Sequence, residues 1–199
     1  MKILIILLII ICIIIHVKST EFVYKTGSTF YKYKEYEIWD IIHSNFIDYS
    51  KYNYKKNFYL ILFILPLLLN KINIDFIKEF VLKFLIIILL RSLTIISTIL
   101  PKNNNNVKID KKYNNLSLFD KIIGAGYDKM FSGHFAFGLL LTLLYFKYNI
   151  LESNWFNTII FFIINLIHLF ILSITRSHYT MDMIVSLYVT LFVFICVKM

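Results

Sequence analysis

A histidine and an aspartate four residues apart, His178 and Asp182, form a pair that could do chemistry. On a helix, residues at this spacing share one face, so the carboxylate can hydrogen-bond to the imidazole. Such a bond fixes the imidazole tautomer and makes the other ring nitrogen a better base or nucleophile. Arg176, two residues before the histidine, offers a planar fork of N–H donors that suits a phosphate. This combination favours reactions at phosphorus.

A second histidine ends the string Asp128-Lys-Met-Phe-Ser132-Gly133-His134, directly before an apolar stretch. Ser132 suits a helix N-cap, and Gly133 lets the backbone approach a ligand. Because a helix N-terminus attracts anions, His134 is placed to donate to a phosphate oxygen or to protonate a leaving alkoxide. The tripeptide Ser-Gly-His alone is a weak signal, because chance supplies it often.

Arg91 lies inside an apolar stretch that ends at Pro101. An arginine in the middle of a membrane costs about 2.5–3.5 kcal/mol on insertion scales. Two interpretations stay open. In the first, Arg91 reaches the interface or pairs with a carboxylate and is structural. In the second, it faces the interior of a helix bundle and holds a lipid phosphate or an active-site acid.

Two histidines on separate helices, one backed by a carboxylate and both near an arginine, suit phosphoryl transfer through a phosphohistidine. One histidine attacks phosphorus, while the other protonates the departing alcohol and later deprotonates the incoming one. Histidine, cysteine and aspartate do not cluster at metal-binding spacing, so we predict neither a metal nor another cofactor. The two cysteines, Cys12 and Cys196, lie in apolar runs and indicate no disulfide.

The amino-acid composition indicates that these residues belong to a membrane protein. Of the 199 residues, 59% are hydrophobic and 17% are charged, with a mean hydropathy of +0.72. Ordinary globular domains are roughly 45–50% apolar and about 25% charged. A soluble enzyme, a disordered protein and a disulfide-rich secreted module are therefore excluded, and an integral membrane protein is predicted.

Six apolar segments predict an all-α, polytopic fold, a bundle of six transmembrane helices. A bilayer core about 30 Å thick needs about 20 helical residues, which the third and fifth segments supply. The second is the weakest, because it is short and carries Pro66. The segments are Ile3–Val17, Phe58–Leu69, Phe76–Leu100, Phe135–Ile150, Phe156–Ile174 and Met183–Val197.

The predicted domain organisation has three parts. Residues 1–20 form an N-terminal transmembrane segment, a signal anchor or a signal peptide, residues 21–57 form a loop, and residues 58–199 form the transmembrane catalytic core. With six crossings, the long polar loops 18–56 and 101–131 and the stretch 175–182 share one side of the membrane. All three chemical clusters then lie at that face.

Together the clusters resemble the PAP2-like lipid phosphatase/phosphotransferase superfamily and, within it, the sphingomyelin synthase family. Order and spacing agree over residues 36–195. Two residues depart from the family pattern and leave the choice of head group open: Phe135 replaces a small hydroxyl residue and Tyr127 replaces a glycine. The matching strings are Asp128-x-x-Phe131-Ser132-Gly133-His134, His178-Tyr179-Thr180-x-Asp182, Arg91-x-x-Thr94-x-x-x-Thr98-x-Leu100-Pro101 and, more loosely, Glu37-Ile-Trp39-Asp40-Ile-Ile-His43.

The resemblance implies a membrane-embedded transferase that moves phosphocholine from phosphatidylcholine to ceramide, giving sphingomyelin and diacylglycerol. By similarity, His134, His178 and Asp182 form the catalytic triad, with His178 as the nucleophile. The substrate-binding residues predicted with them are Arg91, Arg176, Asp128, Ser132, Gly133 and Tyr179.

Several alternatives stay open. The head group could be ethanolamine or inositol, the enzyme could be a PAP2-like lipid phosphodiesterase or phosphatase, or the scaffold could bind lipid without catalysis. The expected partners are a phospholipid donor and a ceramide acceptor, without nucleic acid, and an oligomer is compatible with this scheme.

The charge distribution conflicts with the orientation that the resemblance implies. The family places the catalytic face in the lumen or outside the cell, in the Golgi, the endoplasmic reticulum or the plasma membrane. However, thirteen lysines fall on the predicted catalytic side and five on the other, so the positive-inside rule favours a cytosolic catalytic face. We expect the family orientation, because lysine is abundant throughout and the net charge of +9 reflects a compositional bias.

The remaining histidines carry weaker signals. His168, midway along the fifth apolar segment, is predicted to be a hydrogen-bonded packing residue, and His16 an interface residue. His43, close to Asp40, fits a substrate contact and a plain loop position equally well. Asp40 and Asp128 are the two further acids that we expect as partners of an arginine or of the choline ammonium.

Overall fold

The computed structural model describes residues 2–31, 38–52, 58–101, 127, 129–152 and 154–198. Within these ranges the regular elements are helices, and no strand occurs. The predicted site residue Asp128 lies outside the described residues. The helices are α1 (Lys2–Phe30), α2 (Ile41–Asn45), α3 (Phe58–Leu69), α4 (Ile74–Ser97), α6 (Gly133–Lys147), α7 (Trp155–Ile174) and α8 (Thr180–Cys196).

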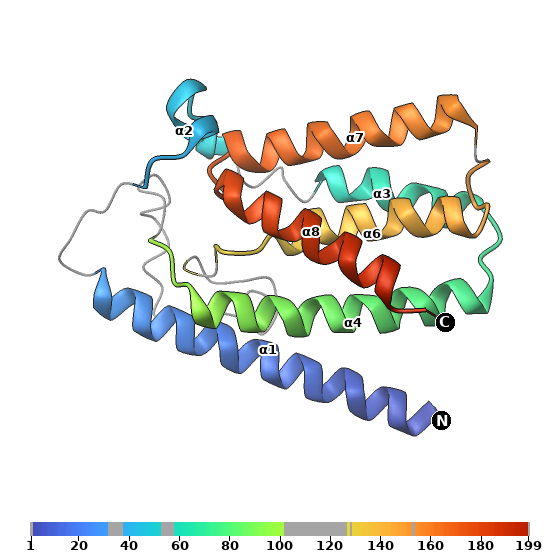
Figure 1. Ribbon diagram of the computed structural model, residues 1–199, viewed down its shortest axis with the longest axis horizontal. Coiled ribbons are helices and arrows are strands. Elements are labelled where there is room, and N and C mark those ends of the chain that lie inside the picture. Colours follow the sequence, from blue (N-terminus) through green and yellow to red (C-terminus); the bar gives the residue numbers. More distant parts are fainter. Residues whose placement is uncertain are drawn as a thin grey trace.

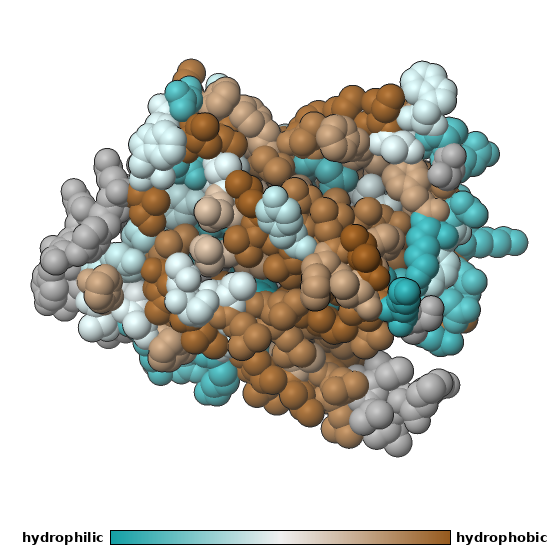
Figure 2. All heavy atoms as spheres, viewed as in Figure 1, coloured by the Kyte–Doolittle hydropathy of each residue, from teal (hydrophilic) through white to brown (hydrophobic). Residues whose placement is uncertain are grey.

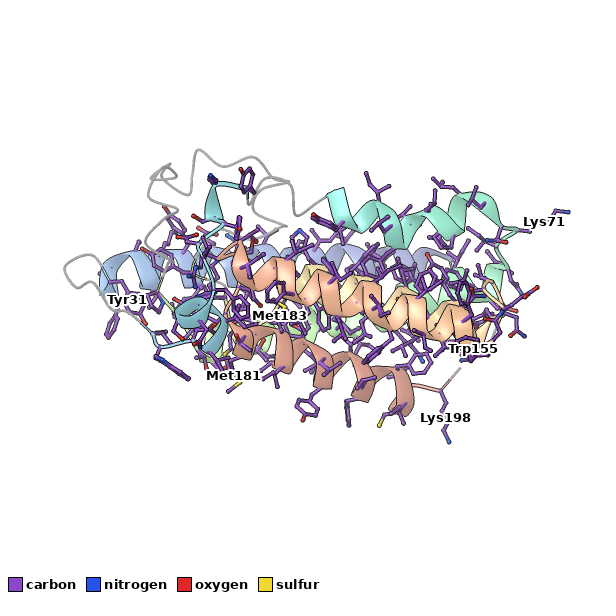
Figure 3. The ribbon with its side chains drawn as sticks, turned by 90° about the horizontal axis from the view of Figure 1, so that it is seen from above. Tyr31, Lys71, Trp155, Met181, Met183 and Lys198 are labelled. Carbon is purple, nitrogen blue, oxygen red and sulfur yellow. The ribbon has the colours of Figure 1, made fainter. Side chains whose placement is uncertain are left out.

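The six longer helices lie side by side with their axes roughly along one direction (Figure 1). The chain reverses direction at each connection, so both termini and the α3–α4 and α6–α7 turns gather at one end. Helix α2 and the α7–α8 connection lie at the other end, called here the site end. In Figure 3, Tyr31 and Met181 lie toward the site end, while Lys71, Trp155 and Lys198 lie at the opposite one. This alternation agrees with the sidedness expected for the loops.

In the part of the chain that the structure describes, three helices are long and apolar enough to cross a membrane: Ile6–Phe30, Ile74–Ser97 and Trp155–Ile174. Apolar residues cover the middle of the face seen in Figure 2, and hydrophilic residues gather at its right-hand end. The helical fold and the membrane class predicted from composition are therefore supported. The other apolar helices, Tyr59–Leu69, Gly133–Lys147 and Thr180–Cys196, are shorter. Six crossings stay a prediction.

Helix α1 continues to Phe30, ten residues beyond the boundary expected at residue 20. Glu21 forms ion pairs with Lys18 and Lys25 at 3.1 and 2.7 Å, and both pairs have the spacing that stabilises a helix surface. Val23 is buried in the core, so packing supports the same extension. The beginning of the expected loop 21–57 is therefore helical.

Helix α6 lies at the centre of the bundle, packed against α3, α4, α7 and α8, while α1 packs along α4. Phe63 of α3 lies so close to Gly138 of α6 that a Cβ atom there would come within 2.9 Å of its ring. A glycine at this position lets α3 approach α6. The central helix therefore has neighbours on several sides, and its N-terminus is fixed within the bundle.

The end opposite the site is held by a buried ionic cluster. The carboxylate of Glu79 accepts hydrogen bonds from Lys147 at 2.6 Å and from the hydroxyl of Tyr148 at 2.7 Å, and it pairs with Lys83 at 2.7 Å. Lys83 also donates to the carbonyl of Phe194 at 2.7 Å. These bonds join α4, α6 and α8 where the polar groups would otherwise be buried without partners.

Candidate active site

The N-terminus of α6 carries one of the two predicted catalytic histidines. Ser132 caps the helix, since its Oγ accepts the backbone N–H of Phe135 at 3.3 Å. Gly133 is the first helical residue and His134, which is partly exposed, is the second. The predicted N-cap is therefore present, and His134 lies in the first turn, where the helix dipole favours negative charge.

The N-terminus of α8 carries the other histidine. Nδ1 of His178 lies 3.1 Å from Oδ2 of Asp182, and the same oxygen accepts the backbone N–H of Tyr179 at 2.9 Å. His178 is 8% exposed and Asp182 is fully buried. One carboxylate thus caps the helix and orients the imidazole. When Nδ1 donates to this carboxylate, the lone pair lies on Nε2.

Hydrogen bonds connect the two helix N-termini. The backbone N–H of Ser132 donates to Oγ of Ser186 at 2.7 Å, and that hydroxyl donates to the carbonyl of Asp182 at 2.6 Å. Lys129, just before α6, donates to the carbonyl of Ser177, just before α8. The segments that carry the histidines are therefore fixed relative to each other, although their residues lie far apart in sequence.

Arg91 reaches the same region from α4. Its side chain is 2% exposed, and its Nε lies 3.5 Å from the carbonyl of Phe131. A Cβ atom at Gly133 would come within 3.7 Å of the same Nε. The arginine therefore lies beneath the first turn of α6, facing the bundle interior, and the phosphate-holding role of the second interpretation stays a prediction.

Helix α2 covers the start of α8. Asp40 is the N-cap of α2 and also accepts the backbone N–H and the hydroxyl of Thr180, at 2.6 and 2.9 Å. Nε2 of His43 donates to the carbonyl of His178 at 3.0 Å. Arg176 donates to the carbonyl of His43 at 2.6 Å. These contacts hold the segment that contains His178 from its outer side.

Two ionisable groups of this junction lie outside the membrane-spanning helices. Burial opposes the ionised form of Asp40, but hydrogen bonds from His43 and Thr180 outweigh burial and hold the pKa of the carboxyl below its ordinary value. Burial lowers the pKa of His43, although the charge of Asp40 acts in the opposite direction. A neutral His43 beside an ionised Asp40 is the favoured state.

The structure brings most of the predicted site residues to one end of the bundle. The N-terminus of α6 carries Ser132, Gly133 and His134, and the N-terminus of α8 carries His178 and Asp182. Arg91 lies beneath the first turn of α6. Tyr179 is the N-cap of α8, and its hydroxyl donates to the carbonyl of Pro101 at 3.3 Å. The guanidinium of Arg176 contacts α2 and its C-cap, donating to the carbonyls of His43 and Phe46. A phosphate-binding role for Arg176 stays a prediction.

The two departures from the family pattern have visible structural roles. Phe135 is buried, and its ring centroid lies 6.3 Å from that of His168. Tyr127 stacks on Tyr31 and packs edge-on against Tyr24 of α1, with centroids 6.2 and 5.8 Å apart. Both therefore pack between helices. His168 is 2% exposed, in agreement with packing, but neither of its ring nitrogens has a hydrogen-bond partner among the described residues, so the hydrogen bond expected for it is not found there.

Sequence reasoning missed Lys129 and assigned His16 to the interface. Lys129 was counted among the lysines of a long loop, yet it is buried and joins two site segments. His16 is also buried and contacts Arg91. Cys12, one helical turn earlier on α1, is buried as well, so the two side chains lie on the inward face of this helix, which the uninterrupted apolar run did not reveal.

This arrangement is suited to phosphoryl chemistry. It combines an imidazole oriented by a carboxylate, a second imidazole at a neighbouring helix N-terminus, and a buried guanidinium. These can act as nucleophile, as acid and base, and as anion holder, respectively.

The family comparison agrees with this chemistry. Residues 127–199 match the model of the PAP2 superfamily C-terminal domain, a range that contains both histidines and Asp182. Searches of curated proteins and of solved structures found no match. The match supports a place for the chain in the PAP2-like superfamily, with an enzymatic activity of the lipid phosphatase or phosphotransferase type.

Proposed function

We propose that this protein is a sphingomyelin synthase-like transferase, which moves phosphocholine from phosphatidylcholine to ceramide and releases diacylglycerol. The observation that carries the proposal is the pairing of His178 with the buried carboxylate of Asp182, 3.1 Å apart, at a helix N-terminus bonded to the one that carries His134. The PAP2 superfamily match supports phosphate-group chemistry in general. The motif resemblance supports ceramide as the acceptor.

In the first half-reaction, Nε2 of His178 attacks the phosphorus of the donor lipid. A P–N bond forms, and the bond between phosphorus and the glycerol oxygen breaks. Protonated His134 gives its proton to the departing oxygen, so the product is neutral diacylglycerol. Asp182 stabilises the positive charge that develops on the imidazole of His178, since its carboxylate already accepts the Nδ1 proton.

In the second half-reaction, neutral His134 takes the proton of the primary hydroxyl of ceramide. The hydroxyl oxygen attacks phosphorus, the P–N bond breaks, and His178 regains its lone pair. Arg91 and the N-terminus of α6 stabilise the negative charge on the phosphate oxygens in both steps. Ser132 and Gly133 contribute by fixing this N-terminus and by leaving space beside it.

The proposal includes the topology of the complete bundle. All six longer helices cross the membrane, with the short ones extended by aromatic residues at the interface. The site end faces the lumen or the cell exterior, where the donor and acceptor lipids of the outer leaflet reach it. By the motif resemblance, the substrate is also contacted by Asp128, Arg176 and Tyr179.

The test is a transfer assay in membranes that contain the full-length protein. Fluorescent ceramide is incubated with each donor in turn, namely phosphatidylcholine, phosphatidylethanolamine and phosphatidylinositol, and the products are separated. We expect fluorescent sphingomyelin with the choline donor. His178→Ala should abolish it at an unchanged protein level, because the nucleophile is lost.

The same assay distinguishes the alternatives. A fluorescent product with only the ethanolamine or the inositol donor would retain the mechanism and replace the head group. Release of a free phosphorylated head group without a ceramide product would indicate a lipid phosphodiesterase. The absence of every product would contradict the proposed enzyme and favour a lipid-binding scaffold.

A further inference from the structure

Arg91, the proposed phosphate holder, is contacted by the N-terminal helix α1. Its Nη1 lies 2.5 Å from Nε2 of His16, and each of the two side chains is only 2% exposed. A guanidinium has no acceptor, so it must be the donor in this contact. Nε2 of His16 therefore carries the lone pair, and the imidazole is neutral.

The second ring nitrogen completes a continuous series of hydrogen bonds. Nδ1 of His16 bears the proton and donates to Oγ of Ser92 at 3.0 Å, and this hydroxyl donates to the carbonyl of Ile88 at 2.9 Å. Each donor in the series meets an acceptor, which fixes the tautomer and the ring orientation of the histidine. Ser92 of α4, whose hydroxyl is itself oriented by the carbonyl of Ile88, thus holds His16 against the arginine.

On its other side, Arg91 meets the beginning of α6. The 3.7 Å distance from its Nε to a Cβ position at Gly133 places the guanidinium beside the helix N-terminus that the proposed function assigns to the phosphate. The arginine therefore lies between α1 and this N-terminus. A change in its contact with α1 would change where its donors point.

We infer that His16 is a positioning residue, a neutral acceptor that directs Arg91 toward the lipid phosphate without adding negative charge beside the guanidinium. The inference rests on the proposed function, because phosphate is the group that Arg91 would hold. A carboxylate at position 16 would also hold the arginine, but it would compete with phosphate for the same cation. Helix α1 then contributes to substrate binding in addition to crossing the membrane.

Three substitutions at one position separate this role from a structural one. His16→Gln keeps a neutral acceptor, because the side-chain oxygen can replace Nε2. His16→Ala removes the acceptor, and His16→Glu replaces it with a charged one. Cys12→Ala is the matched control, since Cys12 is buried one turn earlier on α1 and reports a general loosening of this helix.

We expect the His16 variants to rank differently by kcat/KM than by unfolding temperature. For the donor phospholipid, kcat/KM should stay within about threefold of the wild type in His16→Gln and fall about tenfold in His16→Ala. It should fall further in His16→Glu. The unfolding temperature of His16→Glu should nevertheless equal or exceed that of His16→Ala, because the new ion pair joins α1 to α4. Cys12→Ala should retain wild-type kcat/KM.

The inference fails if His16→Glu is as active as His16→Gln, or if activity simply follows unfolding temperature across the variants. Binding of orthovanadate to the purified full-length protein, measured as a thermal shift, supplies a readout independent of lipid transfer. We expect the shift to decrease from the wild type and His16→Gln to His16→Ala and then His16→Glu. Equal shifts, or no shift in the wild type, would overturn the positioning role. Absence of lipid transfer with this order of shifts intact would contradict only the proposed function.

Discussion

Asp182 performs two tasks with one oxygen. Its Oδ2 accepts the backbone N–H of Tyr179 at 2.9 Å and approaches Nδ1 of His178 at 3.1 Å. The orientation of the imidazole is therefore coupled to the first turn of α8. An asparagine in this place could still accept the N–H of Tyr179 through its amide oxygen, but it has no negative charge to stabilise a positively charged imidazole. A single substitution can therefore remove the charge beside His178 and keep the cap of α8.

We predict that Asp182→Asn lowers the rate of lipid transfer by about a hundredfold or more, because the carboxylate no longer supports the imidazolium of His178. The unfolding temperature should fall only slightly, because the asparagine can retain the cap of α8. Transfer assays and thermal unfolding of the purified protein check both parts. Transfer at a near wild-type rate would contradict the proposed role of Asp182.

At the scale of elements, the short helix α2 fixes the beginning of α8 from outside the bundle. Asp40 accepts two hydrogen bonds from Thr180, and His43 donates to the carbonyl of His178. Negative charge at a helix N-terminus is favourable, so Asp40 stabilises α8 electrostatically as well. Arg176 completes the junction by donating to the carbonyl of His43.

We predict that this junction weakens as the pH falls. Burial lowers the pKa of His43 below 6.5, while Asp40 raises it and Arg176 lowers it. The unfolded chain then binds a proton more readily than the folded one, so the stability contributed by neutral His43 is present above pH 6.5 and is lost as the pH falls through the folded pKa.

The measurement compares thermal unfolding of the wild type and His43→Gln between pH 7.5 and pH 5. Glutamine can donate to the carbonyl of His178 but does not titrate in this range. The unfolding temperature of the wild type should decrease more steeply toward low pH than that of the variant. Parallel profiles would show that His43 does not contribute to the pH dependence.

At the scale of the whole molecule, the helices alternate in direction (Figure 1), and apolar residues cover the middle of the face seen in Figure 2. The site end contains the two helix N-termini and α2, and the opposite end contains both termini and the cluster around Glu79. Three helices have the length of a membrane span, so a bilayer would surround the apolar middle. The two histidines proposed as catalytic then lie close to one membrane surface.

We predict that the site end faces the lumen. A protease-cleavable tag inserted within residues 103–106 should resist protease in sealed vesicles whose cytosolic face points outward, and should be cleaved after detergent is added. A tag after Lys198 should be cleaved in both conditions and serves as the control. Cleavage of the loop tag in intact vesicles would instead support the orientation that the lysine distribution favours.

The sequence alone indicated the membrane class, the approximate positions of six apolar helices, and the chemistry of His134, His178 and Asp182. The observed helix boundaries differ from the predicted ones where local charge and packing compete with hydropathy. Glu21 is an example, because its ion pairs keep α1 helical beyond the apolar run. Such local patterns are readable because their residues lie within one or two helical turns of each other.

Only the tertiary structure decided which distant residues meet. His16 contacts Arg91 across 75 residues of sequence, and Asp40 caps a helix that begins 140 residues later. Periodicity within a segment shows which face of a helix is apolar, but it does not specify the neighbouring helix or the residue opposite. Those pairings depend on how the whole bundle packs, and this packing turns three separate sequence motifs into one candidate site.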